Sequence, residues 1–208
     1  MNKQITIGRQ LGSGGRTIAA LVADHLGCQF YDREILNLAA RESGFAEEAF
    51  EKIDEKRSIL RAFSAATSFL TPHSSIETPQ GDFSPEGLFK FQSDAIRKAA
   101  EQASCVFVGR CADYILRDVE GLVTVFVTAD LDERVEQVAQ RHQCDHQEAL
   151  RIIHHKESQR AAYYNYYTGK RWGDSSSYHL CINSSRLGIE RTAQYIEEFV
   201  LKTYKRAD

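Results

Sequence analysis

The sequence lacks the usual features of membrane, secreted and nucleic-acid-binding proteins. No apolar run in its 208 residues approaches the roughly 20 residues that a membrane-spanning helix needs. The net charge is only −3, and acidic and basic residues are mixed along the chain, so no nucleic-acid or membrane partner is expected. The five cysteines form no CxxC pair and indicate reduced packing residues. We therefore expect a soluble, cytoplasmic protein with small-molecule ligands.

Proline is also scarce, and all three prolines lie within residues 64–87, a segment rich in Ser and Thr. This segment is predicted to be a mobile loop. Elsewhere, short β-branched or aromatic runs alternate with amphipathic segments, which predicts a three-layer α/β fold with a parallel sheet. The predicted strands are residues 4–8, 28–32, 104–109, 123–128 and 178–183. The predicted helices include 16–27, which ends on Gly27, and 32–44, 131–142 and 188–202.

Glycine is concentrated in one place, the segment "GRQLGSGGRT" at residues 8–17. It lies between the first predicted strand and the first predicted helix. Such a turn presents backbone N–H groups at a helix N-terminus, where a di- or triphosphate binds. The spacing matches neither the strict GxxxxGK[ST] pattern nor GxGxxG. A glycine-rich turn without a ligand remains the alternative.

Three longer segments resemble the cytidylate kinase-like family, a branch related to the nucleoside monophosphate kinases. They are "ITIGRQLGSGGRTIAALVADHLGCQFYDREIL", "VFVGRCADYIL" and "YYNYYTGKRWGDSSSYHLCINSSRLGIE". The resemblance implies a single P-loop kinase domain over residues 1–208 with a five-stranded parallel sheet. It also implies a helical acceptor-binding insertion at about 45–100 and a lid at about 145–177. The implied reaction transfers the γ-phosphoryl group of ATP, with Mg²⁺, to a nucleoside monophosphate, most favourably CMP or dCMP.

The resemblance assigns residues to the ATP site by position. Arg16 stands where the related cytidylate kinases carry lysine, and its planar guanidinium suits two phosphate oxygens at once. The Thr17 hydroxyl is the candidate Mg²⁺ ligand, with helix capping as the alternative. The loop "NSSRLGIE" resembles the one that borders the adenine. The cofactor-binding candidates are Gly12, Ser13, Gly14, Gly15, Arg16, Thr17, Ser184, Ser185 and Arg186.

Acceptor-binding candidates follow the second and third strands. The segment "FYDRE" lies at the carboxyl end of the second predicted strand, and ligands bind at such ends of parallel strands. Asp32 and Arg33 in this segment are therefore candidates, although Asp32 is equally suited to cap a helix. Arg110 ends a buried strand, where a cation needs a carboxylate or a phosphate as partner. Asp113 is the candidate for the acid of the family's Gly-Arg-Asp segment, although Cys111 occupies the place expected for that acid.

The lid candidate is basic and aromatic. Lys156 and Arg160 are the predicted catalytic cations, because phosphoryl transfer requires charge neutralisation and exclusion of water; Lys170 and Arg171 come next. The alternative is a solvated helix face. The tyrosines between residues 163 and 167 are suited to a homodimer surface as well as to the lid. Histidines and Cys144 within 142–155 include metal-ligand types, but their spacing is not that of a zinc site.

Two classes of function fit these features. The first is an ATP-dependent kinase, for a nucleoside monophosphate or for another small acceptor. The second is a nucleotide-binding regulatory module with little turnover. Arg16 in place of lysine and the displaced acid after Arg110 favour the module, whereas Thr17, Arg110 and the lid cations Lys156 and Arg160 favour the kinase.

Overall fold

The computed structural model describes residues 2–32 and 85–205. Residues 2–32 and 96–205 belong to one compact unit, and residues 85–95 belong to another. Helix α5 (Pro85–Gln102) begins in the second unit and ends in the first. The described candidate residues all lie in the first unit.

Three of the sequence predictions fall on the chain between the described parts. The predicted helix at 32–44 lies outside the described residues, apart from Asp32. The predicted loop and the implied acceptor-binding insertion at about 45–100 lie outside them as far as residue 84. The loop prediction was wrong at its end, because α5 already begins at Pro85. Proline is well tolerated in the first turn of a helix, where its missing N–H costs no hydrogen bond.

The described residues contain a five-stranded parallel sheet with the order β2-β3-β1-β4-β5. All five predicted strands are confirmed. Strand β1 lies at the centre, pairing with β3 on one side and with β4 on the other. The segment that follows β1 therefore leaves the sheet where the order reverses, the usual place for a ligand in an open α/β sheet. The strands are β1 (Gln4–Arg9), β2 (Gln29–Tyr31), β3 (Cys105–Val108), β4 (Val123–Thr128) and β5 (Leu180–Asn183).

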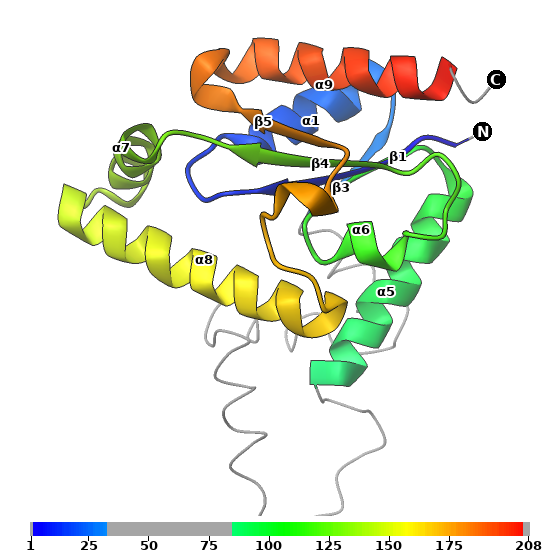
Figure 1. Ribbon diagram of the computed structural model, residues 1–208, viewed down its shortest axis with the longest axis horizontal. Coiled ribbons are helices and arrows are strands. Elements are labelled where there is room, and N and C mark those ends of the chain that lie inside the picture. The colour runs from blue at the N-terminus through cyan, green and yellow to red at the C-terminus, as the bar shows by residue number, and fades with distance from the viewer. Residues whose placement is uncertain (1, 33–84, 206–208) are drawn as a thin grey trace, which may run out of the picture. The chain divides into compact units, whose positions relative to one another are not determined.

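Helices cover both faces of this sheet, so the predicted three-layer arrangement is confirmed. Helices α1 (Gly15–Leu26) and α9 (Gly188–Lys205) lie together on one side, whereas α6 (Ala112–Ile115) and α8 (His146–Thr168) lie on the other (Figure 1). Side chains alternate between the two faces along β1, so Ile5 and Ile7 point to the same face and belong to the core shared with α1 and α9.

Helix α7 (Leu131–His142) follows β4 and packs on α8. The apolar contact comes from residues such as Val135 and Val138 on α7 and Ala149 and Ile153 on α8. The predicted helices at 16–27, 131–142 and 188–202 are thus confirmed. The predicted end of the first at Gly27 is confirmed too, because Gly27 adopts a φ of 63° and its N–H bonds the helix's last carbonyls.

All five cysteines are free thiols, as expected. Cys105 and Cys111 are buried, but Cys181 is exposed, so packing does not account for it. Cys181 lies on β5, an edge strand of the sheet. No helix in the described part of the chain is both long and apolar enough for a bilayer.

Candidate functional site

The glycine-rich segment forms a turn from the end of β1 to the start of α1. Gly14 takes the N-cap position in the left-handed conformation, with φ 68°, and has no side chain to cap the helix, although the N–H of Gly15 donates to the Ser13 hydroxyl at 3.4 Å. Beyond Gly14, residues Arg16 and Thr17 are exposed on the first turn. An uncapped helix N-terminus carries partial positive charge and donates backbone N–H groups, which suits an anion. The local geometry therefore fits a phosphate group.

Serine side chains hold this turn in place. The Ser13 hydroxyl donates to the carbonyl of Gln10 at 3.0 Å. The Ser184 hydroxyl, from the 3-10 turn η2 (Ser184–Arg186), lies 2.8 Å from the Ser13 carbonyl and 3.0 Å from the Thr128 carbonyl. The structure thus brings Ser184 to the glycine turn, where its hydroxyl bonds the backbone of two segments.

Ser185 and Arg186 contact the start of α7. The N–H of Asp130 donates to the Ser185 hydroxyl at 2.9 Å, and Nη2 of Arg186 lies 3.2 Å from Oδ2 of Asp130. The Arg186 side chain remains 76% exposed. These residues therefore lie beside the segment that follows β4, and their proposed contact with adenine stays a prediction.

Arg16 is paired with Asp32. Its Nε donates to Oδ2 of Asp32 at 2.6 Å, and its guanidinium lies 5.9 Å from the centre of the Phe30 ring. The Arg16 side chain is 66% exposed, whereas that of Asp32 is only 13% exposed. Asp32 directly follows β2, so the carboxylate lies at the carboxyl end of the sheet, as predicted for an acceptor-site residue. Arg33 lies outside the described residues.

A further arginine, Arg9, was not singled out in the sequence. Its Nη2 lies 3.7 Å from Oδ1 of Asp32, and its side chain is 21% exposed. Burial lowers the pKa of Arg9 to about 9, and repulsion from Arg160, Arg110 and Arg16 acts in the same direction, whereas Asp32 raises it. Guanidinium groups from four separate segments therefore converge near the carboxyl ends of β1 and β3.

Sequence reasoning had a signal for Arg9. The argument that singled out Arg110, a cation at the end of a buried strand, applies equally to Arg9 at the end of β1.

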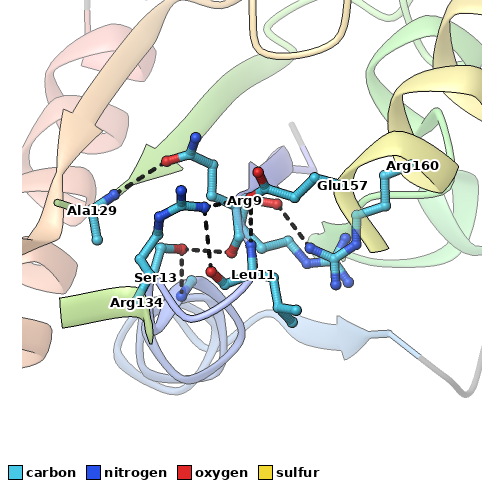
Figure 2. A network of polar contacts seen from close by, with 9 residues as sticks. Arg9, Leu11, Ser13, Ala129, Arg134, Glu157 and Arg160 are labelled. Carbon is cyan, nitrogen blue, oxygen red and sulfur yellow. Dashed lines mark hydrogen bonds and ion pairs between the residues drawn. The ribbon is translucent and has the colours of Figure 1, made fainter. Parts of the chain in front are cut away.

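Helix α8 contacts the glycine turn directly through charged side chains (Figure 2). The Glu157 carboxylate accepts from the N–H of Leu11 at 3.1 Å and from Nη1 of Arg134 at 2.5 Å. One helical turn on, Nη1 of Arg160 donates to the carbonyl of Arg9 at 3.2 Å. Burial lowers the pKa of Arg160 as well. The structure therefore places the predicted lid residue Arg160 at the turn, while Lys156 is exposed.

Glu157 was missed in the sequence, since its role depends on Arg134 of another helix.

The segment after β3 has an unusual backbone. Gly109, Arg110 and Cys111 all have positive φ, at 72°, 58° and 57°. Non-glycine residues rarely adopt this region, and such strain gathers at functional sites. Two residues on, Asp113 accepts a 2.6 Å hydrogen bond from the Tyr164 hydroxyl of α8. The structure thus places Arg110 among the clustered arginines. It places Asp113 in contact with α8.

The tyrosine-rich end of α8 offers little of the predicted homodimer surface. Tyr164 is 5% exposed, and Tyr163 and Tyr167 are partly buried, with ring centroids 4.8 Å apart. Tyr166 is 58% exposed. Most of these rings therefore pack within the chain, and the described structure does not support the homodimer.

The described residues contain no group of three or more His, Cys, Asp and Glu side chains that could hold a metal ion. The exposed Thr17 hydroxyl fits a Mg²⁺ ion that keeps most of its ligands as water and phosphate oxygens.

Comparisons with known proteins identify relatives of this chain. The profile of the cytidylate kinase-like family matches residues 4–186. A cytidylate kinase from Methanopyrus kandleri is 27% identical, covering 98% of this chain and 96% of the relative. One from Pyrococcus horikoshii is also 27% identical, covering 89% and 82%.

Solved structures show the same fold. An uncharacterized protein from Eubacterium ventriosum superposes with a TM-score of 0.72 at 25% identity, over 96% of this chain and 98% of that one. Shikimate kinase from Bacteroides thetaiotaomicron has a TM-score of 0.52 at 14% identity, over 95% and 98%, which shows a shared P-loop kinase fold alone. Because the family profile covers most of its length, the chain belongs to the cytidylate kinase-like family.

Proposed function

We propose that the protein transfers the γ-phosphoryl group of ATP to a nucleoside monophosphate, with CMP or dCMP as the favoured acceptor. The observation that carries this proposal is the convergence of Arg9, Arg110 and Arg160 beside an uncapped helix N-terminus. An uncapped N-terminus suits the phosphates of a nucleotide, and clustered guanidinium groups suit the charge that spreads over a phosphoryl group in transfer. The two relatives named as cytidylate kinases support the choice of acceptor.

On the donor side, the backbone N–H groups of the turn and the first residues of α1 would bind the ATP phosphates. Thr17 would hold Mg²⁺ through its hydroxyl. When bound, Mg²⁺ neutralises negative charge on the phosphate oxygens. Arg16 would contact the phosphates from the exposed side of the turn, where it already pairs with Asp32.

On the acceptor side, Arg110 would bind the monophosphate, because it follows β3 at the same edge of the sheet as Asp32. Arg160 would stabilise the transferred phosphoryl group from α8, and the contact of α8 with the turn would exclude water. The assignments of residues 45–100 to acceptor binding and of residues 145–177 to a lid remain part of this proposal, as does that of Lys156 to catalysis.

One observation favours the regulatory module instead. Arg16, which the resemblance matches to the lysine of the related cytidylate kinases, and Asp113, the candidate for the displaced acid, are both engaged within the chain, with Asp32 and Tyr164. A protein that only binds nucleotide could keep these contacts permanently, whereas a kinase must loosen them when substrates bind.

Turnover distinguishes the two functions. The experiment measures ADP release from Mg-ATP by the full-length chain with CMP, dCMP, UMP, AMP and GMP, and without acceptor. We expect acceptor-dependent ADP release, highest with CMP or dCMP, and its loss in Arg160→Ala. Arg151→Ala, at an exposed position on the same helix, is the matched control and should retain activity. ATP binding without turnover on any acceptor would favour the module, and absence of both would overturn the proposal.

A further inference from the structure

We propose that Arg9 is the cation of the phosphate turn and contacts the phosphoryl group that ATP transfers. This inference rests on the proposed function and adds a residue to its site. In the GxxxxGK[ST] pattern a lysine directly follows the second glycine. The resemblance implied that Arg16 takes the place of this lysine. When the second glycine is instead matched to Gly14, the N-cap of α1, Gly15 and not Arg16 stands in the place of the lysine, and Arg9 stands in the place of the first glycine. The chain has therefore lost one cation and gained another.

The space around Gly15 shows that the two changes belong together. A Cβ atom added at Gly15 would lie 2.5 Å from Cβ and 3.1 Å from Cγ of Arg9. Real Cβ atoms essentially never show a contact as short as 2.5 Å, so the stem of Arg9 fills the space that a side chain at Gly15 would need.

The far end of the Arg9 side chain lies against a second glycine, Gly109. A Cβ at Gly109 would lie 2.4 Å from Nη1 of Arg9. Arg9 therefore extends from the turn toward the end of β3, past Gly15 and then Gly109. This path places the guanidinium between the turn assigned to ATP and the β3 segment assigned to the acceptor, where the transferred group must pass.

The charges around Arg9 favour the binding of an anion next to its guanidinium. Asp32 is 3.7 Å from its guanidinium, but that carboxylate makes its short 2.6 Å bond to Arg16. Arg160 adds a further positive charge beside Arg9. A largely buried cation among other cations is costly without a close anionic partner, and a phosphoryl group supplies one.

A neighbouring arginine shows what a structural role looks like in this protein. Arg134 is similarly buried, with 7% of its side chain exposed, and it holds Glu157 at 2.5 Å. That carboxylate also accepts from the backbone of Leu11. Arg9 has no carboxylate at such a distance among the described residues, so its side chain is placed for a ligand rather than for the fold.

The first test separates ligand binding from stability. In Arg9→Met, we expect the ligand-free melting temperature to stay level or rise, because repulsion among the arginines is relieved. Affinity for Mg-ATP should fall at least tenfold by calorimetry. In the control Arg134→Met, the ligand-free melting temperature should fall, because Glu157 loses its partner. A destabilised Arg9→Met protein that binds Mg-ATP like the wild type would overturn the inference.

The second test returns the cation to position 15. Arg9→Gly removes both the charge and the stem that blocks Gly15, so Arg9→Gly with Gly15→Lys should regain at least tenfold of the Mg-ATP affinity lost in Arg9→Gly alone. Gly15→Lys by itself should destabilise the chain, since Arg9 remains in the way. A double variant no better than Arg9→Gly would contradict the inference.

Measurements on the wild-type protein show which of the two proposals has failed. If it binds Mg-ATP and phosphorylates an acceptor while Arg9→Met does both equally well, only the role of Arg9 is wrong. If the wild type binds no nucleoside triphosphate, the proposed function fails and the role of Arg9 fails with it.

Discussion

Asp113 is a partly buried carboxylate whose hydrogen bond comes from a phenol, Tyr164. Burial raises the pKa of Asp113, although the Tyr164 hydrogen bond and the charge of Lys170 act in the opposite direction. The folded chain therefore holds this proton more tightly than the unfolded chain. Stability from this group is present at acid pH and is lost as the pH rises through the raised pKa.

Asp113→Asn should therefore raise the free energy of unfolding at pH 7, because asparagine keeps an acceptor for Tyr164 without a buried charge. The gain should shrink as the pH falls through the raised pKa and be largely absent below about 4, where the wild-type carboxyl is protonated in both states. Urea denaturation at pH 7 and pH 4 measures this. Asp118→Asn, at a carboxyl that is 86% exposed, is the control and should show little change. A stability loss at pH 7 would contradict the argument.

Arg16 offers a second prediction at this scale. If it contacts the ATP phosphates, Arg16→Ala should weaken Mg-ATP binding by about 1.5 kcal/mol, the low end for a charged hydrogen bond, because its side chain is 66% exposed and solvent screens it. Isothermal titration calorimetry measures this change. Unchanged affinity would remove Arg16 from the ATP site and leave its role as the partner of Asp32.

Single residues were predictable from sequence only where a motif or an unusual position marked them. Arg110 was chosen because it ends an apolar run, and the structure places it beside Arg160. Arg9 stands in the quoted glycine segment, yet its importance depends on the space at Gly15 and Gly109. Two positions almost a hundred residues apart acquire this relation only when β1 and β3 pair, so no local pattern contains it.

Among the elements, strands and most helices could be read from sequence because each has its own periodicity or end signal. Helix α8 was harder to interpret, since its charged residues equally suited a solvated surface. In the structure, Glu157 and Arg160 fix this helix to the glycine turn. Its position is therefore set by charged contacts that an apolar stripe does not predict, although Ile153 also packs against α7.

The contact of α8 with the turn can be tested by removing Glu157. Glu157→Ala leaves Arg134 without its carboxylate and the Leu11 N–H without an acceptor. We expect the free energy of unfolding to fall by about 3 kcal/mol, as for other broken buried pairs. Mg-ATP affinity should fall as well, because the turn loses a support.

The matched control lies on the same helix. Glu148 pairs with Arg151 at an exposed site, and its side chain is 44% exposed. Glu148→Ala should lower the free energy of unfolding by less than about 1 kcal/mol. Equal losses in both variants, measured by urea denaturation, would show that α8 depends on helix propensity rather than on its contact with the turn.

For the molecule as a whole, the strand order could not be derived from alternation alone. Parallel strands joined by helices are compatible with several orders. The observed order puts β1 between β3 and β4 and thereby gathers Arg9, Asp32 and Arg110 at one edge of the sheet. The family resemblance predicted a common site for these segments, whereas the geometry of that site depended on the order.

The whole chain has a net charge of −3, so an anionic nucleotide is not attracted by its overall charge. Binding must come from the local arginine cluster and the helix N-terminus. Mg-ATP at a hundredfold excess over its dissociation constant should then stabilise the protein by about 2.7 kcal/mol. For a chain of this size that corresponds to a melting temperature about 5 to 10 °C higher.

Thermal unfolding with fragments of the ligand shows which part of the nucleotide carries this effect. Tripolyphosphate should raise the melting temperature, because the arginines and the turn recognise phosphate, whereas adenosine at the same concentration should leave it unchanged. High salt should reduce the effect of tripolyphosphate, since the cluster includes the exposed Arg16. A shift with adenosine as large as that with Mg-ATP would mean that the base, rather than the phosphates, is the principal contact, and the arginine cluster would then need another explanation.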